Sequence, residues 1–236
     1  MKAIICASVV LLFATQSIAQ TIEVSAYATA GLSHYVGNYA TATAYIGPSI
    51  SGRESIDKRD NNPYGSKRTF SNSFGAQGQF ISKQGIIGGL QIGIENLRSE
   101  VHIDEYKGTY PQTFSYDATS TLARQFLNIN PYVGYRILLN NVKIDLMPGL
   151  DIGLSMSGIK RIKSDDTGRP YLAEERVKDI PVDYRLRFGS AIYYNRIGLV
   201  ASYSRGLKNY VAITKGSQTA EAKSEVMRLG LTYRFY

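Results

Sequence analysis

The residue types that most often perform catalysis are scarce in this chain, and one pair of them is adjacent. Ser33 directly precedes His34, one of only two histidines in the sequence. A serine and a histidine could act as nucleophile and base in lipid chemistry if their side chains meet and a third group orients the histidine. No residue pattern supplies that third group, and no His-x-Ser motif follows. We therefore predict that His34 is an interfacial residue and that the protein is not an enzyme.

A second candidate for chemistry is the string Asp-Asp-Thr-Gly at residues 165–168, which contains the Asp-Thr-Gly of aspartic proteases. Those enzymes need two such carboxylates facing each other, and this chain has a single string. Lys163 and Arg169 flank it. We predict a polar turn at this position and no catalytic residue.

Metal ligands are equally sparse. The only cysteine, Cys6, lies near the start of the chain and the two histidines are far apart, so the sequence contains no transition-metal set. Four acidic residues could hold Ca²⁺ weakly, but their intervals do not match the alternating ligands of an EF-hand loop. These residues are Asp165, Asp166, Glu174 and Glu175. We predict a solvated charged loop, with no metal site and no cofactor.

The first twenty residues have the layout of a secretory signal peptide. Lys2 gives a short positive start, residues 4–14 are almost wholly apolar, and Ser17 and Ala19 place small residues where signal peptidase reads them. The apolar stretch is well short of the ~20 residues that a membrane-spanning helix needs. We predict that residues 1–20 are a cleaved signal peptide and that residues 21–236 form one exported domain.

The net charge of the chain is +8 at pH 7. An exported protein rarely meets nucleic acid, so we predict no nucleic-acid partner. Two interpretations of the cations remain open: they bind the phosphates of lipopolysaccharide, or they keep long loops soluble. The cations concerned are Arg53, Lys58, Arg59, Lys67, Arg68, Lys160, Arg161, Lys163 and Lys178.

Period-two alternation recurs along the whole exported domain, and no long helical period interrupts it. It is clearest in the last predicted strand, where one face is apolar and the other carries arginines and small residues. The apolar face is Met227, Leu229, Leu231, Tyr233 and Phe235, and the other is Arg228, Gly230, Thr232 and Arg234. Buried arginines would be costly inside a soluble sandwich, whereas a charged lumen is ordinary in a transmembrane barrel.

The links between the predicted strands alternate between short and long. The strands are expected at residues 23–35, 73–82, 86–97, 125–139, 142–156, 182–194, 197–208 and 225–236. Tight turns at residues 83–85, 140–141 and 195–196 contain the residues that hairpins prefer. The alternation predicts an all-β fold: an eight-stranded antiparallel up-and-down transmembrane β-barrel of the bacterial outer membrane, with short periplasmic turns and long extracellular loops.

The inward-facing positions of these strands carry acids and bases in nearly equal number. An eight-stranded barrel is just wide enough for side chains to fill it, and unpaired charges there would cost several kcal/mol. We therefore predict an interior filled by ion pairs, with a narrow channel as the alternative. The predicted lumen residues are Glu23, Glu95, Asp145, Asp151 and Asp183 with Arg136, Lys143, Arg185, Arg187, Arg228 and Arg234.

Two prolines conflict with the strand assignment, because proline has no N–H to donate to a neighbouring strand. Pro131 and Pro148 both fall inside predicted strands. Pro148 lies on the apolar face of its strand, and we expect a bulge or a local kink to absorb it.

The end of the chain resembles a known family. Residues 228–236, Arg-Leu-Gly-Leu-Thr-Tyr-Arg-Phe-Tyr, finish on an aromatic and are similar to the β-signal read by the barrel-assembly machinery. Together with Gly-Leu-Val-Ala-Ser-Tyr-Ser-Arg-Gly-Leu at residues 198–207, they resemble the end of the PorT-like outer-membrane β-barrels of Bacteroidota. The resemblance implies a barrel over the whole exported domain and, more loosely, a role in type IX protein secretion.

These observations predict a non-catalytic outer-membrane barrel that is structural or belongs to a secretion or envelope-assembly complex. Its expected partners are outer-membrane lipid, lipopolysaccharide and envelope or secretion-machinery proteins. A lipid-modifying enzyme or a narrow channel is the alternative. An enzyme should lose activity when His34 is replaced by alanine, and a channel should respond to changes in lumen charges such as Arg185 and Asp151.

Overall fold

The computed structural model describes residues 19–49, 57–60, 62–107, 113–164, 171–177, 181–211 and 220–235. The predicted signal peptide lies almost wholly outside these residues and stays a prediction. Within them the chain forms strands and contains no helix long and apolar enough to cross a membrane. The strands are β1 (Ala19–Val36), β2 (Thr43–Ser49), β3 (Asp57–Asp60), β4 (Lys67–Ser82), β5 (Ile86–Lys107), β6 (Thr113–Leu139), β7 (Val142–Ser164), β8 (Tyr171–Arg176), β9 (Asp183–Tyr194), β10 (Ile197–Gly206) and β11 (Lys223–Arg234).

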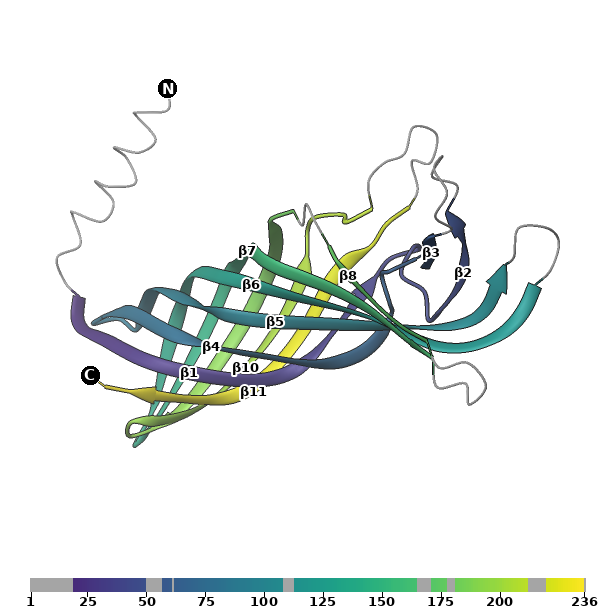
Figure 1. Ribbon diagram of the computed structural model, residues 1–236. Coiled ribbons are helices and arrows are strands. Elements are labelled where there is room, and N and C mark those ends of the chain that lie inside the picture. Colours follow the sequence, from purple (N-terminus) through teal and green to yellow (C-terminus); the bar gives the residue numbers. More distant parts are fainter. Residues whose placement is uncertain are drawn as a thin grey trace, which may run out of the picture.

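Eight of these strands pair into a closed ring (Figure 1). Going round it, β5 pairs with β4, β4 with β1, β1 with β11, β11 with β10, β10 with β9, β9 with β7 and β7 with β6, and the pairing of β6 with β5 closes the circle. Every pairing in the ring is antiparallel. A closed ring leaves no strand edge with unpaired backbone groups. The predicted all-β antiparallel architecture is confirmed.

Three tight turns join neighbouring strands at one end of the ring, between β4 and β5, between β6 and β7, and between β9 and β10. Gly85, Asn140 and Asn195 adopt positive φ angles of 86°, 52° and 54° in these turns. Two-residue hairpin loops need such angles, which glycine and asparagine tolerate best. The predicted turns are therefore confirmed residue for residue. The opposite end of the ring carries the long connections.

Burial alternates along the ring strands as the sequence predicts. In β9, the odd residues from Asp183 to Tyr193 are buried and the even residues from Tyr184 to Tyr194 are mostly exposed. In β11, Arg228 and Arg234 are buried, whereas Leu229 is 62% exposed. Because successive side chains of a strand point to opposite faces, one apolar face covers the outside of the ring and one polar face lines its interior.

Four strands extend well beyond the predicted bounds at the long-connection end. β5 continues past Leu97, β7 continues past Met156, β6 begins before Gln125, and β4 begins before Ser73. Figure 1 shows β5 and β6 projecting beyond the ring, with β2 and β3 beside them. β2 pairs with β5 and β3 pairs with β2, while β8 pairs with β7. Much of what the sequence analysis assigns to long loops is thus a sheet.

We call the parts of β4, β5, β6 and β7 beyond the ring, with β2, β3 and β8, the extension. The sequence analysis did not predict its strands because the polar and apolar faces exchange sides there. Along β5 the outward face changes from Ile92 and Ile94 to Arg98 and Glu100, while the inward face changes from Glu95 to apolar residues. The extension has a small apolar core of its own, which β2 and β8 help to cover. Its buried members are Ile46, Ile103, Ala118 and Ile162. This is the polarity of a water-soluble sheet, opposite to that of the ring.

The two prolines are accommodated without the expected bulge. Pro131 remains paired with β5 and Pro148 remains paired with β9. Only the seam between β6 and β7 is interrupted beside them, and its register is identical on both sides of each gap. The N–H and C=O of one strand residue point to the same neighbour, so a proline disturbs pairing on one side only. Both prolines face the same seam, and the prediction of a bulge at Pro148 is wrong.

Candidate functional site

The interior of the ring holds a first cluster of charges close to the tight turns. Arg136 donates to Glu23 at 2.7 Å through Nη1 and to Asp145 at 2.6 Å through Nε. Arg234 lies 3.2 Å from the same Glu23 carboxylate, and Gln79 donates to it at 2.7 Å. The Arg234 guanidinium also stacks on the ring of Tyr193, 3.3 Å from its centroid. Two carboxylates and two guanidinium groups therefore neutralise one another here.

A second, larger cluster lies further towards the long-connection end. Arg185 bonds to Glu95 and also approaches Asp183 and Asp151 at 3.6 and 3.7 Å. Arg228 pairs with Glu95, and lies 3.2 Å from Asp151. Arg187 adds a third cation at 3.3 Å from Asp151. Ser204 and Ser224 donate hydroxyl hydrogen bonds to the carboxylates.

All the predicted lumen charges lie inside the ring except one. Lys143 sits at the edge, with a side chain 43% exposed and 3.9 Å from Glu23. The others are almost completely buried, and Arg185 is not exposed at all. Acids and bases in the two clusters balance, which is what a low-dielectric interior requires. These buried side chains occupy the described part of the lumen.

The mouth of the ring carries a cation that the sequence analysis missed. Arg124 of β6 is 5% exposed, and its guanidinium carbon lies 4.5 Å from the centroid of Tyr210, 5.6 Å from that of Tyr35 and 5.8 Å from that of Tyr64. Among the described residues, its Nε and Nη1 atoms have no hydrogen-bond partner. Aromatic faces attract a desolvated cation, and the three tyrosines take the place of a carboxylate.

Tyr35 lies at the end of β1, whereas Tyr64 and Tyr210 belong to a cap formed by two long connections. The Tyr64 hydroxyl donates to the Tyr210 carbonyl at 3.0 Å, and the Glu221 N–H donates to the Asn38 side chain at 2.7 Å. Asn209 ties the second connection to itself by donating to Ala220 at 2.7 Å. Burial in this cap raises the pKa of Tyr210 well above its usual range. The cap closes the mouth above the second charge cluster.

The adjacent Ser33 and His34 do not meet. Ser33 points inward, where its hydroxyl donates to the Arg98 carbonyl at 2.6 Å and accepts from the Arg98 N–H at 2.9 Å. His34 is on the opposite face of β1, 3.7 Å from Glu225. Neighbours in a strand alternate between faces, so this serine and this histidine cannot act as nucleophile and base. His102 lies on the extension, 3.8 Å from Asp117.

The acidic candidates are either outside the described residues or already engaged. Residues 165–168, with Asp165 and Asp166, fall outside. Glu174 bonds to Arg161 at 2.8 Å, and Glu175 lies opposite Lys160 on the neighbouring strand. Throughout the part of the chain that the structure describes, no three His, Cys, Asp or Glu side chains are grouped to hold a metal ion.

The predicted loop cations do not form one patch. Lys67 pairs with Glu100 at 3.3 Å, Lys160 is buried, and Arg68 is exposed near His34. The side chains of Arg53, Lys58, Arg59 and Lys178 lie outside the described residues.

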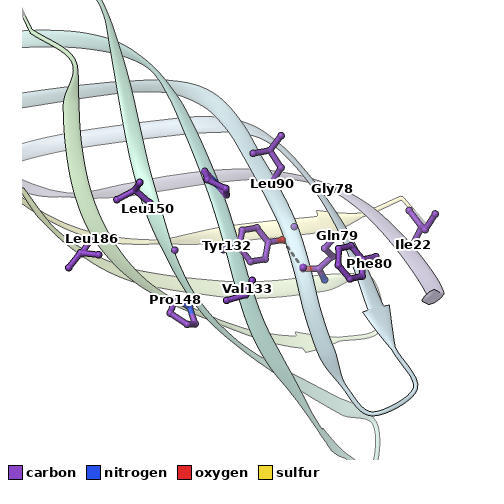
Figure 2. Close-up of a pocket in the computed structure, with 14 residues that line it drawn as sticks. Ile22, Gly78, Gln79, Phe80, Leu90, Tyr132, Val133, Pro148, Leu150 and Leu186 are labelled. Atoms are coloured by element: carbon purple, nitrogen blue, oxygen red, sulfur yellow. Dashed lines mark hydrogen bonds between the residues drawn. The ribbon is translucent and has the colours of Figure 1, made fainter. Parts of the chain in front are cut away.

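A groove of about 1030 Å³ lies on the outside of the ring, next to the interrupted seam (Figure 2). Its floor is lined by glycines of β4, β5 and β7, and Ile22, Phe80, Leu186 and Pro148 stand around it. Tyr132 and Gln79 lie behind the wall and are joined by a 2.9 Å hydrogen bond (Figure 2). The described lining is mostly apolar, so the groove can receive an apolar group.

No family model and no curated protein matches the chain. Several solved structures are similar to it, and three of them are described here in turn. They are neisserial surface protein A (12% identity, 92% of this chain and 100% of that chain, TM-score 0.42), the attachment invasion locus protein Ail of Yersinia pestis in complex with the heparin analogue sucrose octasulfate (13%, 92% and 100%, 0.33), and the outer membrane protease OmpT of Escherichia coli (11%, 92% and 97%, 0.43). At these identities and TM-scores, none of the three transfers a role to this chain.

Proposed function

We propose that this protein is an integral, non-catalytic β-barrel of the bacterial outer membrane, spanning it with the eight strands of the closed ring. The reversed polarity of that ring carries the proposal. Outward residues such as Ile22, Val133 and Leu231 are 68%, 68% and 58% exposed, while the interior holds paired charges. A soluble protein rarely exposes so extensive an apolar band, and in hydrocarbon a closed ring satisfies every backbone group.

The proposed orientation puts the tight turns in the periplasm and the extension outside the cell. Bacterial barrels of this kind have short periplasmic turns and longer extracellular connections. The change of β5 from apolar to charged on its outward face supports this placement, because the apolar part suits hydrocarbon and the charged part suits water. The small core formed with β2 and β8 then serves an extracellular sheet.

The barrel is proposed to anchor this sheet and to conduct no solute. Filled charge clusters and the cap over Arg124 support a closed interior. A rigid membrane anchor with an external sheet fits a structural role or membership of a secretion or envelope-assembly complex, in line with the PorT-like resemblance of its last strands. Its partners on this proposal are outer-membrane lipid, lipopolysaccharide and envelope or secretion-machinery proteins.

The test begins with membrane fractionation of cells that express the full chain, followed by electrophoresis with and without heating. We expect the protein in the outer-membrane fraction, and we expect heating to change its migration because a lipid-adapted barrel resists detergent until heated. Recovery in a soluble fraction would overturn the barrel. The purified protein is then inserted into planar bilayers, where no steady conductance is expected.

Two variants separate the proposal from its alternatives. A steady conductance that changes in Asp151→Asn would favour a channel, because Asp151 lies in the larger charge cluster. A lipid-modifying activity that disappears in His34→Ala would favour an enzyme. Crosslinking of the tagged protein in its own cells then identifies partners. Reproducible recovery of secretion-machinery proteins supports the complex, and recovery of lipopolysaccharide alone supports a stand-alone anchor.

A further inference from the structure

A row of side-chain amides interrupts the apolar outer surface of the ring. Asn72 of β4, Asn96 of β5 and Gln125 of β6 face outward at directly paired positions. Asn96 donates to Asn72 at 3.0 Å, and Gln125 donates to Asn96 at 3.1 Å. Amide groups are costly to expose to hydrocarbon unless they are hydrogen-bonded. The two hydrogen bonds within the row satisfy some of its amide groups and leave others open.

The amide row is local to this side of the barrel. The same paired positions continue onto Ala30 of β1 and Leu229 of β11, which are apolar. On β4 itself, Asn72 lies between the outward-facing rings of Phe70 and Phe74, each 56% exposed. We call this row the polar notch: on β4 it lies between two apolar residues, and on β5 it adjoins the charged outward residues Arg98 and Glu100.

A hollow of about 250 Å³ opens on this notch. Asn72, Asn96, Gln125, Ser157 and Arg98 contribute to its lining. Arg98 is the next outward residue beyond Asn96 on β5, and its side chain is exposed. Within the described residues, no ion pair or hydrogen bond engages the Arg98 guanidinium, the Asn72 Nδ2 group or the Gln125 Oε1 atom.

The backbone of Arg98 is held in a specific way. The register of β4 against β5 shifts between Arg68 and Asn72, so this part of β5 loses regular pairing with β4. The Ser33 hydroxyl of β1 replaces it with hydrogen bonds to both the N–H and the carbonyl of Arg98. The backbone that carries this cation is therefore held next to the amides by a third strand.

We infer that this notch binds the phosphorylated sugar headgroup of an outer-leaflet glycolipid; the inference rests on the proposed membrane placement. Arg98 pairs with the phosphate, since a guanidinium matches phosphate oxygens in charge and geometry. The open amide ends exchange hydrogen bonds with sugar hydroxyls. The acyl chains lie below, along Phe74 and the neighbouring apolar residues. The outer surface is polar above this level and apolar below it, so it matches a lipid whose headgroup lies above and whose acyl chains lie below.

The experiment uses the full mature barrel in nanodiscs of phosphatidylcholine and measures lipid binding by native mass spectrometry. The probes are diphosphorylated lipid A, the same lipid with its phosphates removed, phosphatidylglycerol and inorganic phosphate. We expect lipid A to bind, and we expect removal of its phosphates to weaken binding by about tenfold or more, as for the loss of a charged hydrogen-bond partner. Arg98→Ala and Asn96→Leu should weaken lipid A binding to a similar extent.

Arg205→Ala is the matched control. Arg205 is an exposed, outward-facing arginine of β10, but it lies directly opposite Glu225 and outside the amide row. The Arg205→Ala substitution should leave lipid A binding unchanged. Equal losses in Arg205→Ala and Arg98→Ala would overturn the site, because they would indicate general charge attraction. Equal binding of the dephosphorylated lipid, of phosphatidylglycerol or of inorganic phosphate alone would overturn the assignment to a phosphorylated glycolipid.

The outcomes also separate this inference from the membrane placement. If the protein enters nanodiscs and shifts its migration on heating but does not distinguish the lipids, the proposed function stands and the lipid site at the notch is contradicted. If the protein fails to enter the discs, both the membrane placement and the glycolipid site are contradicted.

Discussion

Two of the three carboxylates in the larger lumen cluster, Glu95 and Asp151, are shared between cations from different strands. Glu95 of β5 bonds to Arg185 of β9 and to Arg228 of β11, so one side chain ties together strands on different sides of the ring. Because a shared carboxylate contacts more than one cation, several ion pairs together offset the desolvation free energy of its burial. Sharing also means that no single residue can be neutralised without leaving an opposite charge unpaired in a low-dielectric interior.

Replacing Arg185 by methionine should be strongly destabilising. The substitution keeps roughly the same length but leaves Glu95, Asp151 and Asp183 short of positive charge, at a cost of about 3–5 kcal/mol in the free energy of unfolding. Urea unfolding of the protein in lipid vesicles, followed by tyrosine fluorescence, measures the change. Arg196→Met, in the exposed turn between β9 and β10, should have no measurable effect. Similar losses in the two variants would contradict the paired interior.

Glycines show how tightly the strands approach one another. A Cβ added to Gly75 of β4 would lie 2.2 Å from the Ile92 carbonyl oxygen, a backbone atom that cannot easily move. A Cβ added to Gly78 of the same strand would meet nothing within 4 Å. Elsewhere aromatic rings cover the space that glycine leaves, as Phe80 does over Gly88 of β5. The close approach of β4 to β5 therefore requires glycine at position 75 and does not require it at position 78.

Gly75→Ala should destabilise the barrel and Gly78→Ala should not. Forcing β4 away from β5 is an overpacking effect of about 1–3 kcal/mol, whereas the second methyl group points into open space. Both variants have the same chemistry on the same strand, so strand propensity cancels between them. The midpoint of urea unfolding should fall for the first and stay within error for the second. A fall of equal size in both would mean that the clash is not what matters.

The whole molecule is closed by its first and last strands. β1 and β11 pair over twelve consecutive residue pairs, from Ser25 with Arg234 to Val36 with Lys223. Strands from opposite ends of the chain must therefore meet before the ring exists. The cap adds a second closure at the mouth, where residues near Tyr39 bond to residues near Glu221.

Paired cysteines can test this closure. Ala28 and Leu231 are direct partners that face outward, so Ala28→Cys with Leu231→Cys should form a disulfide under mild oxidation. The only native cysteine, Cys6, lies in the predicted signal peptide and would not compete. The product links the two ends of the chain, which changes its migration in electrophoresis without reductant. Ala28→Cys with Leu199→Cys spans two strands, about 10 Å, and should not crosslink. Equal crosslinking in both pairs would contradict the register.

The sequence by itself was enough to predict the ring strands, their short turns and the inward or outward direction of the side chains that it assigned to a face. The reason is local: strand residues alternate between two faces, and only one face of each spanning strand is apolar. Leu229 and Arg228 of β11 illustrate it. The same rule predicted most of the charges that enter the lumen, although Lys143, which it also placed there, lies at the edge and buried Arg124 was missed.

Only the tertiary structure decided which charges meet and where the alternation reverses. Glu95 and Arg185 are ninety residues apart, and their contact depends on the stagger of strands around the ring, which alternation does not encode. The aromatic cage around Arg124 needs Tyr35 of β1 together with Tyr64 and Tyr210 from two distant connections. Beyond the ring, β5 has the polarity of a sheet in water, with charged residues outward and apolar residues inward, which is the change that the proposed membrane placement requires.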